Sequence, residues 1–330
     1  MYVRALQNVY FLCWNQIKSR KLQKLKTNNS KLKNHDRQLS RLVNIGTPYL
    51  WLVLFFLLPF VIVFQISLAE TALAQPPFTS LWDWAGDGVL QVRLNLQNFV
   101  TVFTDELYLA ALLNSLWIAL VCTGLCLLIG YPMAYAIATA PERWRVILLM
   151  LVILPFWTSF LIRVYAWIGI LNYNGLLNSF LIWAGVIDTP LNILYTQHAI
   201  YLGVVYSYLP FMILPLYANL TRLDLTLLEA AADLGCRPLQ AFRKVTLPLS
   251  RPGIVAGSML VFIPVVGEFV IPDLLGGPGN LMIGKLLWTE FFDNKDWPLA
   301  AALAIALLGL LVVPFVLMQR LERRMEGDES

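Results

Sequence analysis

The stretch from Gly279 to Leu286 comes nearest to a chemical motif in this chain. It nearly fits a phosphate-binding loop, in which backbone N–H groups and a lysine hold the phosphates of a nucleotide. Leu286 stands where that loop needs a serine or threonine for the metal ion. His35 and His198 are isolated, and the four cysteines show neither zinc-ligand nor disulfide spacing. The sequence therefore predicts no catalytic, metal or cofactor site in this chain.

The longest polar segment between two apolar runs carries signals for two short helices. Asp224 or Thr226 suits a helix N-cap, and Thr226 with Glu229 has the spacing of a capping box. Gly235 suits the end of that helix, where a positive φ angle is favoured. Pro238 suits the first turn of the next helix. We expect a helix, a turn and a second helix.

This segment, residues 220–252, is also amphipathic. Leu247-Pro248 is expected to end the second helix, and Pro252-Gly253 to begin the next apolar run. An amphipathic unit on a membrane surface needs a partner against which to bury its apolar side. The expected apolar edge consists of Leu227, Leu228, Ala230, Ala231 and Leu234.

The elements that position this segment are apolar runs long enough to cross a membrane. The chain has 330 residues, of which 58% are hydrophobic and 13% charged, and its mean hydropathy is +0.67. Such a chain needs a bilayer as its solvent. Its basic residues lie at the ends of the apolar runs, so nucleic acid is not an expected partner. Six spans are predicted at 48–69, 109–138, 147–171, 197–219, 253–272 and 298–319.

The distribution of lysine and arginine predicts the topology. With the N-terminus inside, 20 of the 24 basic residues lie in cytoplasmic segments. Both ends are then cytoplasmic: a basic tail over 1–47, a membrane domain over 48–319 and a C-terminal tail over 320–330. The stretch 176–194 is too polar for a span and is expected to be an outer or re-entrant helix.

The polar segment resembles the EAA loop of ABC-importer permeases. The family pattern is Glu-Ala-Ala, three residues, Gly, nine residues, an aliphatic residue, one residue, and Leu-Pro. The chain differs only in having valine where isoleucine is common. The matching residues are Glu229, Ala230, Ala231, Gly235, Val245, Leu247 and Pro248.

This resemblance implies an all-α membrane protein with the six transmembrane helices of a type I importer permease. The loop would be a coupling helix that sits in a groove on a separate ATPase subunit, which would bind ATP and Mg. Two such ATPases, a second permease chain and an extracytoplasmic binding protein would complete the complex in the bacterial inner membrane. The second chain is expected to be related but distinct, with a homodimer as the alternative.

Further stretches are similar to the spermidine/putrescine branch of this family. They lie at 130–135, 154–167, 185–190, 267–277 and 296–298, within a likeness over about residues 45–320. The expected cargo is therefore a polyamine. Iron or thiamine as cargo remains an alternative, as does a secondary transporter, although the spans lack the internal charges that such a carrier needs.

Acidic and aromatic residues near the outer ends of the spans are candidates for a translocation path. An acid in an apolar run is costly unless it faces a cavity or a partner, and aromatic faces attract ammonium groups. Arg163 is expected either to pair with Glu268 or to reach the outer surface. The path candidates are Glu268, Asp273, Trp157, Tyr165 and Trp167.

Overall fold

The computed structural model describes residues 44–85, 89–224 and 226–327. The predicted basic tail therefore lies outside the described residues except for its last few positions. The chain divides into two compact units, Met1–Val63 and Phe64–Ser330. The fold is mainly helical, as predicted, with one unpredicted antiparallel hairpin of strands β1 (Trp82–Ala85) and β2 (Val89–Val92).

The first predicted span is a helix over Asn44–Ser67. It contains a π-helical turn, Val53–Leu57, followed by α2 (Leu58–Ser67). Pro59 has no N–H to donate to the preceding turn, so the register of hydrogen bonds loosens just before it. The same arrangement, a π turn ending immediately before Leu-Pro, recurs later in the chain.

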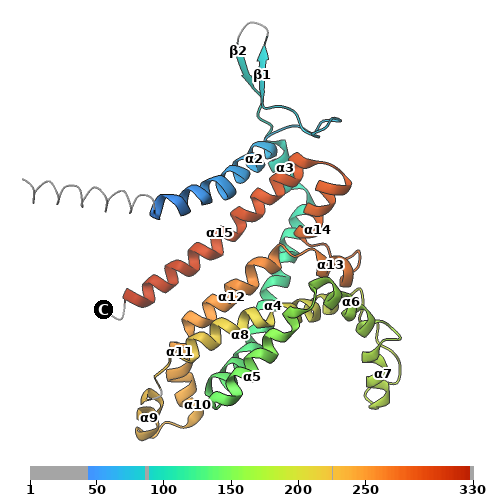
Figure 1. The fold of residues 1–330 in the computed structure, drawn as a ribbon. Helices are drawn as coiled ribbons and strands as arrows, with labels where there is room; N and C mark the ends of the chain where they lie inside the picture. Colours follow the sequence, from blue (N-terminus) through green and yellow to red (C-terminus); the bar gives the residue numbers. More distant parts are fainter. Residues whose placement is uncertain (1–43, 86–88, 225, 328–330) are drawn as a thin grey trace, which may run out of the picture. The chain divides into compact units, whose positions relative to one another are not determined.

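Three long helices form the core of the second unit: α4 (Glu106–Thr139), α8 (Gln197–Leu220) and α12 (Arg251–Val266) (Figure 1). Small residues let them approach closely, as is common between membrane helices. A Cβ atom at Gly257 would lie only 2.8 Å from the Met212 sulfur. Glycine at this position therefore sets the contact between α12 and α8.

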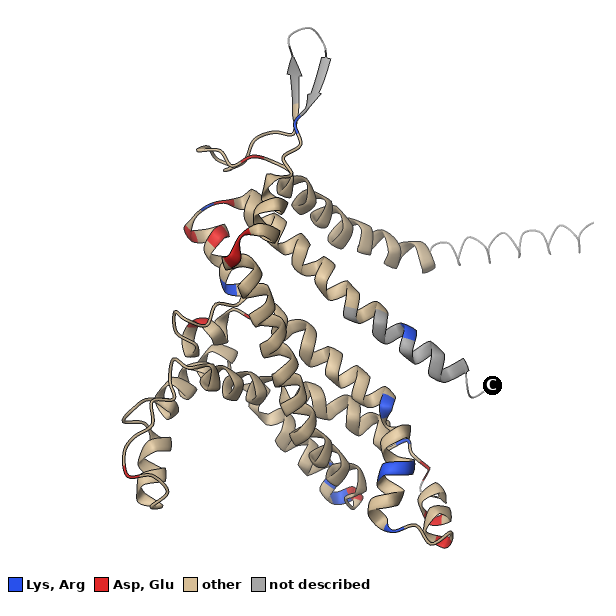
Figure 2. Cartoon of the chain, turned by 180° about the vertical axis from the view of Figure 1, so that it is seen from behind, with Lys and Arg blue, Asp and Glu red and all other residues tan. Residues whose placement is uncertain are grey.

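Charged residues segregate to the two ends of this bundle (Figure 2). The end that carries the α4–α5 turn and the segment 222–251 is rich in arginine and lysine. The opposite end carries Asp273, Glu290, Asp293 and Asp296. The short helical elements at the basic end are α9 (Thr226–Asp233), α10 (Pro238–Ala241), the π turn η3 (Phe242–Thr246) and α11 (Leu247–Leu249). Those at the acidic end are α13 (Val270–Leu275), α14 (Ile283–Trp288) and the π turn η4 (Thr289–Asp293).

A smaller apolar core joins the acidic end to the last helix. It is built by α3 (Gln97–Thr104), α14, the start of α4 and α15 (Trp297–Gly327). Buried Glu290 accepts a 2.8 Å hydrogen bond from the Tyr108 hydroxyl beside this core. The carboxylate thus ties η4 to α4.

Judged by length and composition, fewer helices could span a membrane than the six that the sequence predicted. In the described chain four helices qualify, or five if the pair Pro238–Leu249 and Arg251–Val266, bent by 64°, forms one span. The apolar part of the sixth predicted span, Trp297–Val313, is shorter than the length that qualifies. The predicted spans therefore correspond to helices, but not all of these are continuous.

The prediction of one span over 147–171 is wrong. This region consists of α5 (Glu142–Ile153), a 3₁₀ turn over Leu154–Trp157 and α6 (Phe160–Leu171). Pro155 cannot donate a helical hydrogen bond, and Thr158 is extended. The stretch that is long and apolar enough to span here is Phe160–Trp183. It includes α7 (Leu176–Trp183), which belongs to the segment predicted to be an outer or re-entrant helix.

Candidate coupling and translocation sites

Gly235 ends helix α9 in a Schellman motif. Its φ angle is +80°, as the sequence predicted. The Gly235 N–H donates to the Ala232 carbonyl at 2.9 Å, and the Cys236 N–H donates to the Ala231 carbonyl at 3.0 Å. This pair of bonds requires a residue in the left-handed region, which glycine adopts without steric cost.

Asp224 caps the start of the same helix. Its carboxylate accepts the Thr226 N–H at 2.9 Å, so of the two predicted capping residues the structure uses Asp224. This bond favours the charged form and holds the pKa of the Asp224 carboxyl below its usual range. Both ends of α9 are thus defined locally, by an acid at the start and a glycine at the end.

The second helical segment begins at Pro238, as predicted, and runs to Leu249 with a π turn inside it. Gln240 stabilises its start by accepting the Arg237 N–H at 3.2 Å. In the π turn the Leu247 N–H donates to the Phe242 carbonyl. The cause is again a proline, because Pro248 has no N–H to continue the regular pattern. Val245 lies half-buried within this turn.

The predicted apolar edge of α9 is divided between two directions. Ala231 is buried inside the chain, whereas Leu227 and Leu234 are 46% and 85% exposed. Glu229 and Ala230 are both exposed at the same surface. The expectation of one continuous edge is therefore wrong: Ala231 packs internally, and the leucines face outward near Glu229.

Glu268 lies buried at the break between α12 and α13. One carboxylate oxygen accepts the N–H groups of Val270 and Ile271, at 3.0 and 3.4 Å, and so caps α13. The other oxygen accepts the Tyr208 hydroxyl from α8. Sequence reasoning missed Tyr208, although a tyrosine hydroxyl inside an apolar span signals a buried polar partner.

Arg163 is also buried, but it does not pair with Glu268, although both residues are in the described part of the chain. Its guanidinium lies over the rings of Phe156 and Phe160, at 5.1 and 5.8 Å from their centroids. Phe156 contacts Phe211, and Phe211 contacts Tyr208. Arg163 and Glu268 are therefore linked through aromatic rings rather than through an ion pair.

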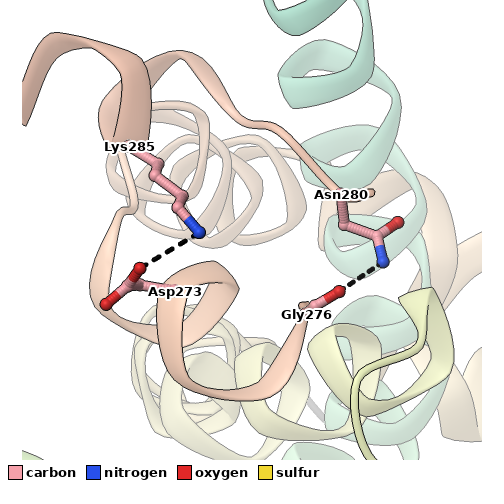
Figure 3. A network of polar contacts seen from close by, with 4 residues as sticks. All are labelled: Asp273, Gly276, Asn280 and Lys285. Carbon is pink, nitrogen blue, oxygen red and sulfur yellow. Dashed lines mark hydrogen bonds and ion pairs between the residues drawn. The ribbon is translucent and has the colours of Figure 1, made fainter. Parts of the chain in front are cut away.

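The residues around the phosphate-loop-like stretch make structural contacts (Figure 3). Lys285 forms a 3.1 Å ion pair with Asp273, and the Asn280 side-chain amide donates to the Gly276 carbonyl. Gly284 packs against the backbone of Gly267. The lysine thus joins α14 to α13.

The five path candidates do not form one cluster. Asp273 lies on α13, which packs against α6, the helix that carries Tyr165 and Trp167. Trp157 and Tyr165 are 81% and 59% exposed, whereas Trp167 packs edge-on against Tyr206. Among the five, only Glu268 is buried.

The chain is thus a helical bundle with a polar helix–turn–helix at one end and broken helices at the other, as expected of a membrane transport permease. The model of the family "Binding-protein-dependent transport system inner membrane component" matches residues 96–327. The chain belongs to this family.

Curated relatives within the family are similar over most of their length. The spermidine/putrescine transport system permease protein PotB of Salmonella typhimurium (strain SL1344) is 41% identical over 283 residues, which cover 85% of this chain and 94% of that protein. PotB of Escherichia coli (strain K12) is 42% identical, over 80% of this chain and 92% of that protein. PotB of Haemophilus influenzae is 38% identical, over 82% and 90%.

Solved structures show the same fold. A bacterial ABC transporter that imports the acidic polysaccharide alginate aligns with a TM-score of 0.62 at 20% identity, over 89% of this chain and 98% of that one. A bacterial alginate ABC transporter in complex with a pentasaccharide-bound periplasmic protein aligns with a TM-score of 0.65 at 19% identity, over 89% and 97%. The predicted fold of an ABC-importer permease is thus confirmed.

Proposed function

We propose that this chain is the permease subunit of an ATP-driven importer of polyamines such as spermidine and putrescine. The observation that carries this proposal is the 41–42% identity to spermidine/putrescine permeases over more than nine-tenths of their length. The family match over residues 96–327 includes the helices of the bundle and the loop proposed below as the coupling loop. Iron and thiamine are less well supported as cargo.

The unit α9–α11 is proposed to dock on a separate ATPase subunit. Leu227, Leu234 and Leu239 are 46%, 85% and 69% exposed at a polar end of the bundle. Exposed apolar side chains in such a place indicate a protein partner. Glu229 would make the polar contact at the edge of this surface, and Ala230 would allow close approach. ATP and Mg would be bound by the partner, where hydrolysis would occur.

Cargo is proposed to pass the acidic end of the bundle. The Glu268 carboxylate accepts three hydrogen bonds there, and the exposed rings of Trp157 and Tyr165 offer faces to ammonium groups. Asp273 and Trp167 are further candidates along this route. An extended chain of ammonium groups matches carboxylates and rings at separate positions better than a compact anion does.

The remaining subunits follow from the same proposal. A second permease chain, related but distinct, would complete the pathway, with a homodimer as the alternative. The basic end of the bundle (Figure 2) would face the cytoplasm and the acidic end the binding protein. The distribution of lysine and arginine in the sequence would place both termini in the cytoplasm.

Uptake of labelled putrescine and spermidine tests the proposal, in cells that lack other polyamine systems and carry or lack this gene. We expect uptake only with the gene, unaffected by unlabelled thiamine or ferric iron and abolished by vanadate. Equal uptake in both strains would overturn the polyamine assignment. Sensitivity to collapse of the proton gradient with resistance to vanadate would overturn the ATP-driven mechanism.

A further inference from the structure

Phe242 makes an aromatic contact between residues 226–250, called here the coupling segment, and the central helix α4. Its ring packs edge-on against Tyr131, with centroids 5.6 Å apart, and against Tyr135, with centroids 5.9 Å apart. The interplanar angles are 87° and 88°. Tyr131 and Tyr135 are one helical turn apart on α4, so Phe242 occupies a socket formed by two consecutive turns.

Tyr131 also contacts the far end of the same segment. Its hydroxyl lies 2.8 Å from the Ser250 hydroxyl, and this contact is buried. Ser250 donates its hydrogen to the Leu247 carbonyl at 3.0 Å. A serine hydroxyl has one hydrogen, so Tyr131 must be the donor in the contact with Ser250. Tyr131 therefore binds both sides of the π turn, by its ring and by its hydroxyl.

The π turn makes this double contact possible. Phe242 and Ser250 are eight residues apart, which in a regular α-helix places them about 80° apart around the axis. The one extra residue of a π turn reduces the separation to about 20°. Both side chains then face α4. This gives Pro248 a role in the geometry, because its missing N–H causes the π turn.

The coupling segment also continues covalently into α12. Beyond Ser250 the chain bends by 64° into α12, so the two helical pieces are not one straight rod. In contrast, α4 packs along both α8 and α12. Ala231 on α9 and Ala241 on α10 are both buried, so these short helices are packed into the coupling segment. A displacement of the coupling segment would therefore reach α4 through Tyr131, and through α4 it would reach α8 and α12.

We propose that Tyr131 and Phe242 form a joint that makes α4 move with the coupling segment. They are positioning residues for ATP-driven transport, and the inference rests on the proposed docking of α9–α11 on an ATPase. The joint predicts a specific defect. Weakening it leaves ATPase binding and hydrolysis in place but lowers the cargo moved per ATP.

The test uses the complete importer, purified and reconstituted in proteoliposomes with its binding protein. Hydrolysis and spermidine uptake are measured together for Tyr131→Phe, which removes one oxygen, and Phe242→Leu, which removes the ring but stays apolar. Tyr173→Phe, the same chemical change at an exposed position between α6 and α7, is the control. We expect uptake per ATP to fall about threefold to tenfold in both variants, the range of one lost buried contact, and to stay unchanged in the control.

The outcomes separate the two proposals. If the wild-type complex retains no ATPase subunit, or hydrolyses ATP without polyamine uptake, the proposed function fails. If the wild type is coupled and Tyr131→Phe keeps the wild-type ratio, the joint is refuted. A parallel fall of uptake and hydrolysis, or loss of assembly in Tyr131→Phe, would also refute it, because Tyr131 would then be structural only.

Discussion

Replacement of Gly235 by alanine tests whether the end of α9 sets the geometry of the coupling segment. The backbone there has a φ of +80°, and a Cβ atom at this position would meet nothing within 4 Å. The cost is therefore conformational, not steric. An L-residue in the left-handed region costs about 1–2 kcal/mol. This corresponds to an opening of the Schellman motif that is about fivefold to thirtyfold more frequent.

The assay is hydrogen exchange of the amides of 226–241 in the assembled importer, combined with polyamine uptake. We expect Gly235→Ala to accelerate exchange at position 235 itself and at Cys236, whose N–H groups make the motif's two bonds, and to lower uptake. Asparagine tolerates the left-handed region better, so Gly235→Asn should be milder.

Gly309→Ala is the matched control. This glycine lies inside α15 with open space around its Cβ position and no positive φ. Alanine is the better helix former there, by about 1 kcal/mol. Unchanged exchange in Gly235→Ala, or equal effects of the two alanine variants, would refute the argument from backbone conformation.

Four further variants test the proposed coupling surface and the acidic end. Glu229→Arg should leave membrane insertion intact but abolish uptake; normal uptake at normal expression would remove the coupling assignment. Glu268→Gln keeps an acceptor for the α13 N–H groups but loses the charge, so uptake should fall while thermal stability in detergent changes little. Glu268→Ala instead leaves the Tyr208 hydroxyl without its partner and should cost about 1–3 kcal/mol in the same unfolding assay. Gly284→Ala would place a Cβ against the Gly267 carbonyl and should destabilise by about 1–3 kcal/mol; an unchanged melting temperature would show that the two segments separate readily.

Local signals in the sequence were enough to predict the helix–turn–helix over residues 226–249. Capping by an acid, a glycine with positive φ and a proline in the first helical turn depend on residues close in the chain, and the structure contains all three at Asp224, Gly235 and Pro238. The long apolar runs likewise indicated helices. Hydropathy, however, does not register where a helix breaks, so the 3₁₀ turn at Leu154–Trp157 was missed.

The partners of individual side chains depend on the packing of distant segments. Glu268 bonds to Tyr208 across 60 positions of sequence, and Tyr131 contacts Ser250 across 119. No periodicity encodes such pairs, because they arise only when α4, α8 and α12 pack together. The sequence by itself thus determined the apolar helices, apart from their breaks, and the helix–turn–helix over residues 226–249, since these follow from hydropathy and local backbone preferences. The tertiary structure alone decided that Glu268 caps α13 and that Tyr131 holds both sides of the π turn, because these contacts require helices brought together by burial of their small and apolar faces.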